Sequence, residues 1–336
     1  MKRAVIVGAG GISDAWFPPL MQEKVEIAAV VDLKVGAAAA KIQKYGLTSE
    51  ASSDLAAALS RARPDFVLDL TVPEAHCQVT CTALRAGCPV IGEKPMASSM
   101  AEARRMVQAS EETGKLFMVS QSRRWDVRHD RVRRTLAAGT LGEVTIASCD
   151  FFLGAHFGGF RDQMESPLIL DMAIHHFDLA RFLTGRDAVA VYAKEFNPRG
   201  SWYAGDSSAC CIFELAGGAI FSYRGSWSAE GFPTSWNGDW RIVGERGTLL
   251  YDRDKDPVVQ VPTSTEGFQR PLGDGPVAAS PLTAQTMHGA LREMLAYLDG
   301  GPKPQTECHD NIRSLAMVFA AKESAASGTR VAVAAG

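Results

Sequence analysis

The chain has 336 residues, of which 46% are hydrophobic and 22% charged, and its formal net charge is −3. These values exclude a disordered chain and predict two domains with sizeable cores, and the slightly acidic balance argues against nucleic acid as the main partner. The seven cysteines form no CxxC pair, and no apolar run approaches membrane-spanning length. A signal peptide is not expected, because the N-terminus enters its first predicted strand at once. We therefore expect reduced thiols in a cytoplasmic protein without a membrane partner.

A glycine-rich turn follows the first predicted strand, Ala4–Val7. Gly8 permits a tight turn, and Gly10 lets the backbone approach a pyrophosphate. The N–H groups at the start of the next helix, those of Gly11 and Ile12 among them, then face the phosphates. A strand, a glycine turn and a helix in this order predict a dinucleotide site.

Asp32 is the second sign of a dinucleotide. It ends the apolar strand Glu26–Val31, about 20 residues after the glycines, where a carboxylate accepts hydrogen bonds from ribose hydroxyls. An ordinary α/β turn is the alternative interpretation of the glycines alone. Asp32 predicts NAD over NADP, since a carboxylate repels a 2′-phosphate, and Lys34 close by keeps NADP open as an alternative.

Strands and helices alternate up to about residue 120. After the glycine turn we expect a helix shortened by Pro18 and Pro19. The further predicted helices cover residues 37–45, a segment capped by Ser53, 74–86 and 99–114, and the further predicted strands cover 66–70, 90–91 and 117–120. This alternation predicts a doubly wound parallel sheet, whose ligand lies beyond the carboxyl ends of the strands.

Lys94 lies at one of these strand ends and is followed by a proline, which restrains it. A solvated surface lysine is the alternative, but the position on the cofactor side favours a functional role. The basic run of residues 123–134 is interpreted as a solvated helix face rather than a nucleic-acid patch. Arg123 and Arg124 are exceptions, because they follow a strand end and are candidates for substrate or cofactor contacts.

The pattern changes in the second half of the chain. Strands are predicted at residues 143–152, 188–196, 207–215, 219–228, 239–243 and 248–251. Hairpin-like links between them indicate a largely antiparallel sheet. Residues 257–281 are expected to form a loop, and helices are expected at 284–298 and 311–326. The predicted domains are a dinucleotide-binding domain, 1–122, and an α+β substrate-binding domain, 123–336.

A helix predicted at residues 168–183 carries the second group of polar residues. Asp171, His175 and Asp178 share one face at α-helical spacing, on an otherwise apolar helix. A structural His–Asp pair is one interpretation. A proton acceptor for hydride chemistry is the other, and the nucleotide site favours it. A metal site is not expected, because neither a cysteine cluster nor an HExxH pattern is present.

Together the glycine turn, Glu93-Lys94-Pro95 and the Asp171-x-x-x-His175-x-x-Asp178 helix resemble the Gfo/Idh/MocA family, which includes glucose–fructose oxidoreductase and inositol dehydrogenase. The resemblance covers nearly the whole chain. It implies a Rossmann domain followed by a domain with an open, largely antiparallel sheet. It also implies an NAD(P)-dependent dehydrogenase or reductase acting on sugars, polyols or related small molecules.

Individual roles follow from the resemblance. Lys94, Asp171 and His175 match the family's catalytic positions. The implied cofactor-binding residues are Gly8, Gly10, Gly11, Ile12, Asp32, Thr71, Pro73, His76, Glu93 and Lys94. In the implied mechanism His175 accepts the hydroxyl proton, Lys94 binds the same oxygen, and Asp171 orients Lys94 or the hydroxyl.

Substrate contacts and partners are further expectations. Arg123, Arg161, Trp202 and Tyr203 are candidate substrate contacts, being polar or aromatic residues in predicted loops. The resemblance also implies a homodimer or homotetramer formed through the second sheet. Two alternatives stay open: an NAD-dependent glycosidase of the same fold, and a regulator that senses a sugar or nucleotide without catalysis.

Overall fold

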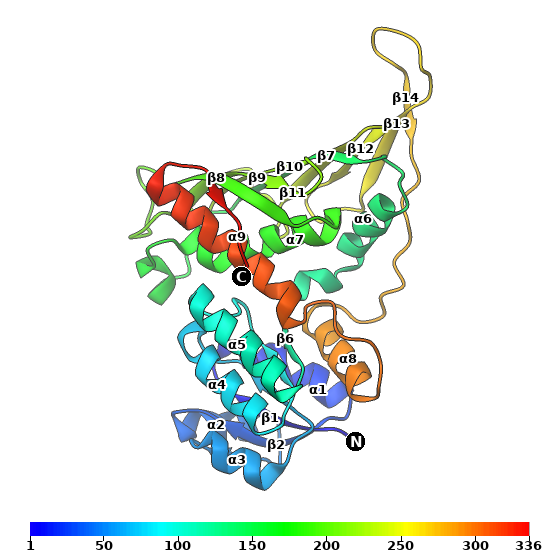
Figure 1. Cartoon of the computed structure of the whole chain (residues 1–336). Coiled ribbons are helices and arrows are strands. Elements are labelled where there is room, and N and C mark those ends of the chain that lie inside the picture. Colours follow the sequence, from blue (N-terminus) through cyan, green and yellow to red (C-terminus); the bar gives the residue numbers. More distant parts are fainter. Residues whose placement is uncertain (336) are drawn as a thin grey trace. The chain divides into compact units, whose positions relative to one another are not determined.

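The computed structural model describes residues 1–335, which form two compact units (Figure 1). The first unit contains residues 1–125 and 283–312, and the second contains 126–282 and 313–335. Neither unit is continuous in sequence, whereas the two predicted domains, 1–122 and 123–336, each form one continuous segment. The division into these two functional domains stays a prediction. None of the helices within residues 1–335 has the length and apolar character that a membrane span requires.

A six-stranded parallel sheet forms the centre of the first unit, in the order β3-β2-β1-β4-β5-β6. The strands are β1 Arg3–Val7, β2 Glu26–Val31, β3 Glu50–Ser52, β4 Phe66–Asp69, β5 Val90–Gly92 and β6 Phe117–Val119. The strand order reverses between β1 and β4, where a doubly wound sheet binds its ligand. The predicted Rossmann architecture is confirmed.

Helices cover this sheet, and their ends follow local signals. They are α1 Phe17–Gln22, α2 Val35–Lys44, α3 Leu55–Ala62, α4 Pro73–Arg85, α5 Met100–Thr113 and α8 Thr286–Leu298, with short 3₁₀ helices η1 Gly11–Ala15 and η2 Ser122–Trp125. As expected, α1 is short, and prolines occupy its first turn. Ser99 caps α5 by accepting the N–H of Glu102 at 3.2 Å.

The predicted cap of α3 is wrong by one residue. Asp54, not Ser53, is the cap, and its Oδ1 accepts the N–H of Ala57 at 3.0 Å. β3 extends to Ser52, whose hydroxyl accepts the N–H of Asp54 at 3.1 Å and so fixes the entry to the helix. The strand was missed because its three residues carry no apolar pattern.

A nine-stranded mixed sheet forms the second unit, in the order β14-β13-β12-β11-β7-β10-β9-β8-β15. The strands are β7 Val144–Phe152, β8 Ala188–Phe196, β9 Ser208–Leu215, β10 Ile220–Ser226, β11 Asp239–Gly244, β12 Gly247–Tyr251, β13 Val258–Pro262, β14 Leu272–Asp274 and β15 Val331–Ala332. Strands β7 and β10 pair in parallel, and the other neighbouring pairs are antiparallel. The expected largely antiparallel sheet is confirmed.

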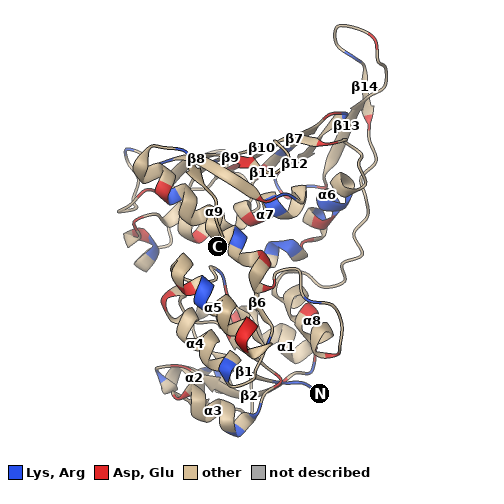
Figure 2. Ribbon diagram, viewed as in Figure 1, with Lys and Arg blue, Asp and Glu red and all other residues tan. Residues whose placement is uncertain are grey.

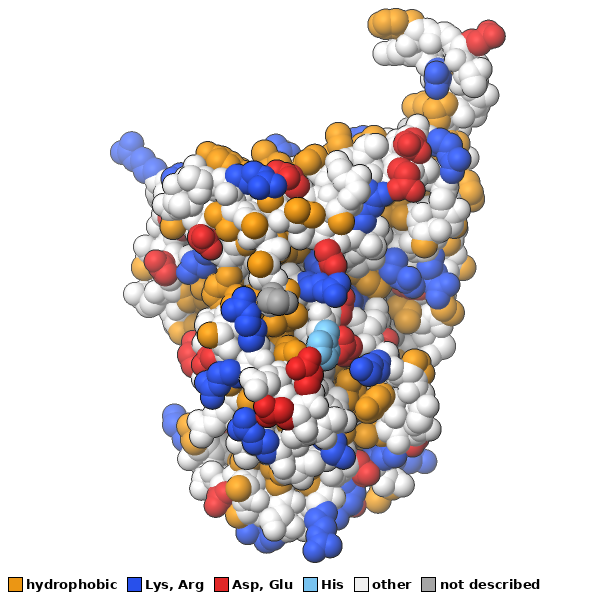
Figure 3. All heavy atoms as spheres, in the orientation of Figure 1, with side chains coloured by type: hydrophobic (Ala, Val, Ile, Leu, Met, Phe, Trp, Pro, Cys, Tyr) orange, Lys and Arg blue, Asp and Glu red, His pale blue; other side chains and the backbone are white. Residues whose placement is uncertain are grey.

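Residues 257–281 are not a plain loop, which corrects the prediction. β13 and β14 pair as an antiparallel hairpin that projects from the sheet (Figure 1). Figure 3 shows hydrophobic side chains near the tip of this arm, where Phe268 is fully exposed. The alternating Val258–Pro262 segment was obscured by the Pro, Gly and Thr residues around it.

Helices pack on one face of the second sheet. They are α6 Val127–Ala137, a π-helix η4 Leu168–Ala173, α7 Ile174–Thr184 and α9 Cys308–Ser327, with a 3₁₀ turn η3 Gly159–Gln163. The apolar side of α7 meets the sheet through Phe177, whose ring lies 4.8 Å from that of Phe213. The division between the units falls inside α9, after Ile312.

The basic run along α6, whose charged residues are coloured in Figure 2, is less solvated than predicted, because none of residues 127–134 is fully exposed. Asp130 is buried, and its carboxylate pairs at 2.7 Å with both Arg133 and Arg134. The hydroxyl of Ser280 also donates to it at 2.7 Å. The charges of α6 therefore neutralise a carboxylate inside the second unit, and sequence spacing alone hid its burial.

Candidate functional site

The glycine turn combines a strained glycine with an open one. Gly8 has φ +100°, and a Cβ added there would lie 2.6 Å from the carbonyl oxygen of Leu70. At Gly10 and Gly11 an added Cβ would meet nothing within 4 Å. Gly8 is thus required by the close approach of β1 to the end of β4, whereas Gly10 keeps space open above the turn.

A cavity of about 850 Å³ lies at this turn, entirely within the first unit. Four of the predicted cofactor residues line it: Gly8, Gly10, Asp32 and Thr71. Its further walls come from residues 53–55, at the start of α3, which sequence reasoning did not assign to the site, and from Val79 of α4. The cap signal before α3, placed after a strand, is the pattern that indicates this segment.

Asp32 is held by the backbone on both sides. Its Oδ2 accepts the N–H of Ala9 at 2.8 Å, and its Oδ1 accepts the N–H of Lys34 at 2.8 Å. The carboxylate is thereby fixed at the cavity wall, with lone pairs left to accept ligand hydroxyls. A fixed carboxylate, an open glycine turn and apolar walls fit the adenosine diphosphate half of NAD.

The N–H groups of Gly11 and Ile12 precede the first hydrogen bond of η1, which joins the N–H of Ser13 to the carbonyl of Gly10 at 3.2 Å. They are therefore not used by the short helix itself. Neither residue lines the cavity, and Pro73, His76, Glu93 and Lys94 do not line it either.

A buried polar cluster follows β4. Asp69 accepts hydrogen bonds from Thr71 Oγ1 at 2.6 Å and from Thr80 Oγ1 at 2.9 Å. The Nδ1 of His76 lies 3.1 Å from the same carboxylate, and both residues are inaccessible to solvent. The Nε2 of His76 is buried and has no hydrogen-bond partner in the part of the chain that the structure describes. Asp69, which has no signal in the local pattern, thus holds Thr71 and His76 in place.

Glu93 and Lys94 follow β5, the neighbour of β4 in the sheet. Glu93 is buried, and this burial raises the pKa of its carboxyl group. Lys94 is half-buried, and its peptide bond to Pro95 is cis. The predicted lysine therefore lies at the carboxyl edge of the sheet that also forms the cavity.

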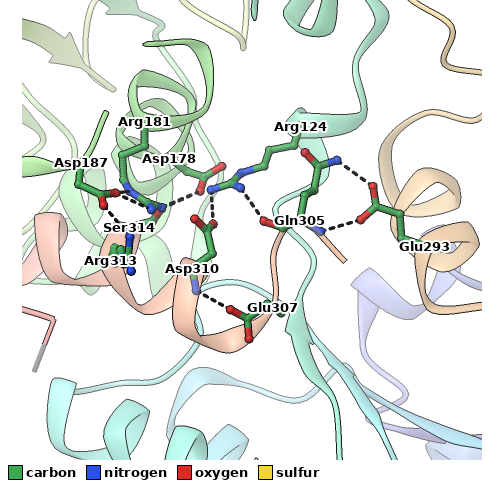
Figure 4. Close-up of polar contacts among 10 residues, drawn as sticks. All are labelled: Arg124, Asp178, Arg181, Asp187, Glu293, Gln305, Glu307, Asp310, Arg313 and Ser314. Carbon is green, nitrogen blue, oxygen red and sulfur yellow. Dashed lines mark hydrogen bonds and ion pairs between the residues drawn. The ribbon is translucent and has the colours of Figure 1, made fainter. Parts of the chain in front are cut away.

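The helix carrying Asp171 begins as a π-helix, which corrects the predicted regular α-helical face. Asp171 lies in η4, whereas His175 and Asp178 lie in α7. Asp171 and His175 are half-buried, but Asp178 is fully buried and accepts the hydroxyl of Ser314 at 2.6 Å (Figure 4). Asp178 therefore takes part in the packing of α7 on α9. The π-helix that carries Asp171 is a feature that occurs often at functional sites.

Arg161 reaches Asp171 from the loop after β7. Its Nε donates to Oδ2 of Asp171 at 2.6 Å. The guanidinium carbon lies 5.0 Å from the ring centroid of Phe157 and 4.8 Å from that of Phe160. Two aromatic rings and a carboxylate therefore fix Arg161.

Trp202 and Tyr203 anchor the same loop. Both donate to the carbonyl oxygen of Ala155, at 3.1 Å from Trp202 Nε1 and 2.5 Å from the hydroxyl of Tyr203. Burial raises the pKa of Tyr203 to about 12, so that its hydroxyl stays protonated. Trp202 also stacks on His156, with ring centroids 3.7 Å apart.

Within the first unit, Arg124 makes contacts that hold the fold together (Figure 4). It is buried, donates to the carbonyl of Gln305 at 2.8 Å and pairs with Asp310 at 2.7 Å. Arg123, its neighbour in η2, is half-buried.

Comparisons with known proteins agree with this architecture. Residues 2–121 match the family described as "Oxidoreductase family, NAD-binding Rossmann fold", and residues 129–250 match the "GFO/IDH/MocA C-terminal domain". A D-apiose dehydrogenase of Paraburkholderia graminis is 30% identical over 91% of this chain and 82% of its own length. A 1,5-anhydro-D-fructose reductase of Ensifer adhaerens is 24% identical over 98% of this chain and 97% of its own length.

A solved structure has a similar fold over the whole length. It is an oxidoreductase from Agrobacterium radiobacter in complex with NAD+, L-tartaric acid and magnesium. Its TM-score to this chain is 0.85 at 22% identity, and the match covers 99% of this chain and 98% of the other. At this identity the likeness shows the fold alone.

Proposed function

Since this chain belongs to the Gfo/Idh/MocA family of NAD-dependent oxidoreductases, we propose that its substrate is a sugar, a polyol or a related small carbohydrate. When bound, the dinucleotide supplies hydride transfer at its nicotinamide ring. The observation that carries the proposal is the position of Lys94. It follows β5, and the neighbouring strand β4 ends beside the cavity that fits the dinucleotide.

Two side chains handle the proton in this proposal. Lys94 donates a hydrogen bond to the substrate oxygen and stabilises its developing negative charge. His175 accepts the hydroxyl proton during oxidation and returns it during reduction. Asp171, held by Arg161, has a positioning role beside His175.

The proposed cofactor residues bind and orient the dinucleotide. Gly10 and the N–H groups of Gly11 and Ile12 receive the phosphates, and Asp32 receives the ribose hydroxyls. Thr71, Pro73, His76 and Glu93 form the nicotinamide side of the site. Arg123, Arg161, Trp202 and Tyr203 remain proposed substrate contacts, and for Tyr203 only the ring is available, because its hydroxyl is bonded to Ala155.

Turnover with a carbohydrate panel tests the proposal. Inositols, aldoses, keto-sugars and anhydro-sugars are offered with NAD, and the absorbance of NADH is followed. We expect reduction with at least one class, and loss of turnover in Lys94→Ala and His175→Asn with NADH binding retained. Sugar release without net NADH would instead identify a glycosidase. Full turnover of Lys94→Ala would contradict the assigned role.

Assembly is a second part of the proposal. The sheet of the second unit exposes apolar side chains from several strands, among them Ile146 of β7, Tyr192 of β8 and Ile212 of β9. We propose that a second copy covers this face in a dimer or tetramer. Light scattering after size-exclusion chromatography should give a molar mass that is a multiple of the chain mass. Ile212→Lys should lower this molar mass. A wild-type protein that is monomeric would contradict the proposal.

A further inference from the structure

We infer that Trp16 is a positioning residue, which connects the phosphate-binding turn to Lys94 through the buried carboxyl group of Glu93. The inference rests on the proposed role of Lys94, and it concerns contacts inside the first unit alone. Neither the glycine pattern nor the Glu93-Lys94-Pro95 segment assigns a role to Trp16.

Within residues 1–335, the carboxyl group of Glu93 has one side-chain hydrogen-bond donor. Its Oε1 accepts the indole N–H of Trp16 at 2.8 Å, and its Oε2 accepts the backbone N–H of Lys94 at 3.2 Å. Trp16 is fully buried, and Glu93 is 6% exposed. Burial raises the pKa of Glu93, while the indole N–H lowers it. Of the contacts that favour the ionised form of Glu93, the bond from Trp16 is the strongest.

Two other titratable groups lie near Glu93. His76 of α4 faces it and is paired with Asp69, and the ammonium group of Lys94 is on the adjacent residue. Asp69 itself accepts from Thr71 and Thr80 and does not rely on a single donor. Of these two buried carboxyl groups, Glu93 has one side-chain donor among residues 1–335, whereas Asp69 has more than one.

Trp16 is also tied to the glycine turn by a short chain of bonds. The hydroxyl of Ser13 donates to the carbonyl of Gly10 at 2.7 Å. The N–H of Trp16 then donates to the carbonyl of Ser13 at 3.0 Å. Two steps of local hydrogen bonding thus join the turn that receives the phosphates to the indole that holds Glu93.

The consequence is a coupling between the turn and Lys94. A phosphate group held at Gly10 fixes η1 and keeps the indole N–H on Glu93, which favours the carboxylate. The charged oxygen accepts the backbone N–H of Lys94 and so holds this residue in place. With the turn free, this chain of bonds is held less firmly, so that Lys94 is less restrained and reacts faster.

Acylation of Lys94 measures this coupling without turnover. The full-length protein is treated with an amine-acylating reagent at constant pH, with and without ADP-ribose, and peptide mass spectrometry quantifies modified Lys94. ADP-ribose fills the phosphate site but has no nicotinamide to cover the lysine. We expect it to slow acylation of wild-type Lys94 by about threefold, which is about 0.7 kcal/mol at 1.4 kcal/mol per factor of ten.

The variants separate this role from a structural one. Trp16→Phe keeps a buried ring but removes the donor, and Glu93→Gln keeps the shape but removes the charge. In both, Lys94 should react faster than in the wild type, and ADP-ribose should no longer slow it. The combination Trp16→Phe with Glu93→Gln should react no faster than Glu93→Gln alone, because both changes act on one bond.

Trp125 provides a matched control. It is buried in the same unit, packs against Gly289, and donates its indole N–H to Glu293 at 2.8 Å. Trp125→Phe should cost similar thermal stability but keep the threefold slowing by ADP-ribose. Loss of the slowing in Trp125→Phe would mean general loosening and would overturn the inference.

Persistence of the slowing in Glu93→Gln overturns the inference as well, and this variant remains informative if Trp16→Phe does not fold. Failure of the proposed function is a separate result, seen as absent turnover with every carbohydrate while the acylation difference persists.

Discussion

The Nε atom of Arg161 lies 2.6 Å from Oδ2 of Asp171, and this bond joins the loop after β7 to the π-helix that precedes His175. Asp171 sits in the π turn and His175 in the following α-helix. The orientation of the helix face that carries Asp171 and His175 therefore depends on Arg161, which lies ten positions before Asp171 in the chain.

Replacement of Arg161 tests this dependence. Arg161→Lys keeps the positive charge but loses the planar fork and the contacts with Phe157 and Phe160. We expect kcat/KM to fall by about 10- to 100-fold, the effect of about 1.5–3 kcal/mol for a hydrogen bond to a charged group. The measurement is steady-state kinetics with whichever carbohydrate is turned over.

Arg330 is the matched control for this prediction. It makes a bidentate pair with Glu214 on the exposed sheet face, at 2.6 and 2.7 Å. Arg330→Lys should leave kcat/KM unchanged within twofold. Equal losses in both variants would argue against a specific role of Arg161.

Substitution of Gly8 and of Gly10 by alanine should have different effects. Gly8→Ala places a Cβ 2.6 Å from a backbone oxygen at φ +100°, so we expect a loss of about 2 kcal/mol or more of folding stability. Gly10→Ala meets no protein atom within 4 Å and should fold normally. It narrows the phosphate site, however, and should weaken NADH binding by about tenfold.

Thermal unfolding and NADH fluorescence titration separate the two effects. Gly36→Ala is a control, because Gly36 lies in α2 and its added Cβ also meets nothing within 4 Å. It should change neither stability nor NADH affinity adversely. Normal NADH affinity in Gly10→Ala would show that the open space above the turn does not receive the cofactor.

Asp32 should set the choice between NADH and NADPH. Asp32→Ser removes the charge while leaving a short hydroxyl near the N–H of Ala9. We expect the ratio of NADPH to NADH affinity to rise by at least about tenfold, because repulsion of the 2′-phosphate is relieved. Fluorescence titrations with both cofactors measure the ratio. Glu50→Gln, whose carboxylate pairs with Arg61 outside the cavity lining, should leave it unchanged.

Glu195 of β8 gives a prediction for pH. It is buried, its Oε2 accepts the hydroxyl of Ser166 at 3.1 Å, and burial raises its pKa from 4.5 to about 7. Between these values the folded protein keeps a proton that the unfolded chain has released. The free energy of unfolding therefore falls as pH rises from about 4.5 through 7, and the full cost is present above 7.

Glu195→Gln should remove that dependence. At pH 8 we expect it to exceed the wild type in stability by about 3 kcal/mol, with the difference shrinking towards zero near pH 4.5. Urea unfolding at several pH values measures this. Glu214→Gln should act in the opposite direction, since Arg330 lowers the pKa of Glu214 and that pair stabilises the fold above its unfolded pKa. A pH-independent gap for Glu195→Gln would contradict the prediction.

The sequence by itself determined the parts of this protein that depend on local pattern. Three features can each be recognised within a short stretch of sequence: an apolar strand followed by glycines, a carboxylate after the second strand, and a lysine before a proline. Strand ends in a parallel sheet meet at one edge, so residues that follow different strands are expected to lie together. The glycine turn, Asp32 and Thr71 were therefore identified as neighbours before any coordinates, and the structure places them around one cavity.

Tertiary structure alone decided which polar groups are buried and with what. The bond from Trp16 to Glu93 and the cluster around Asp69 join residues far apart in the chain, and no periodicity encodes them. The π turn at Asp171 and the hairpin within residues 257–281 depend in the same way on neighbouring segments. Burial is a property of what packs against a side chain, so the charge states of Glu93 and Glu195 follow only from the folded arrangement.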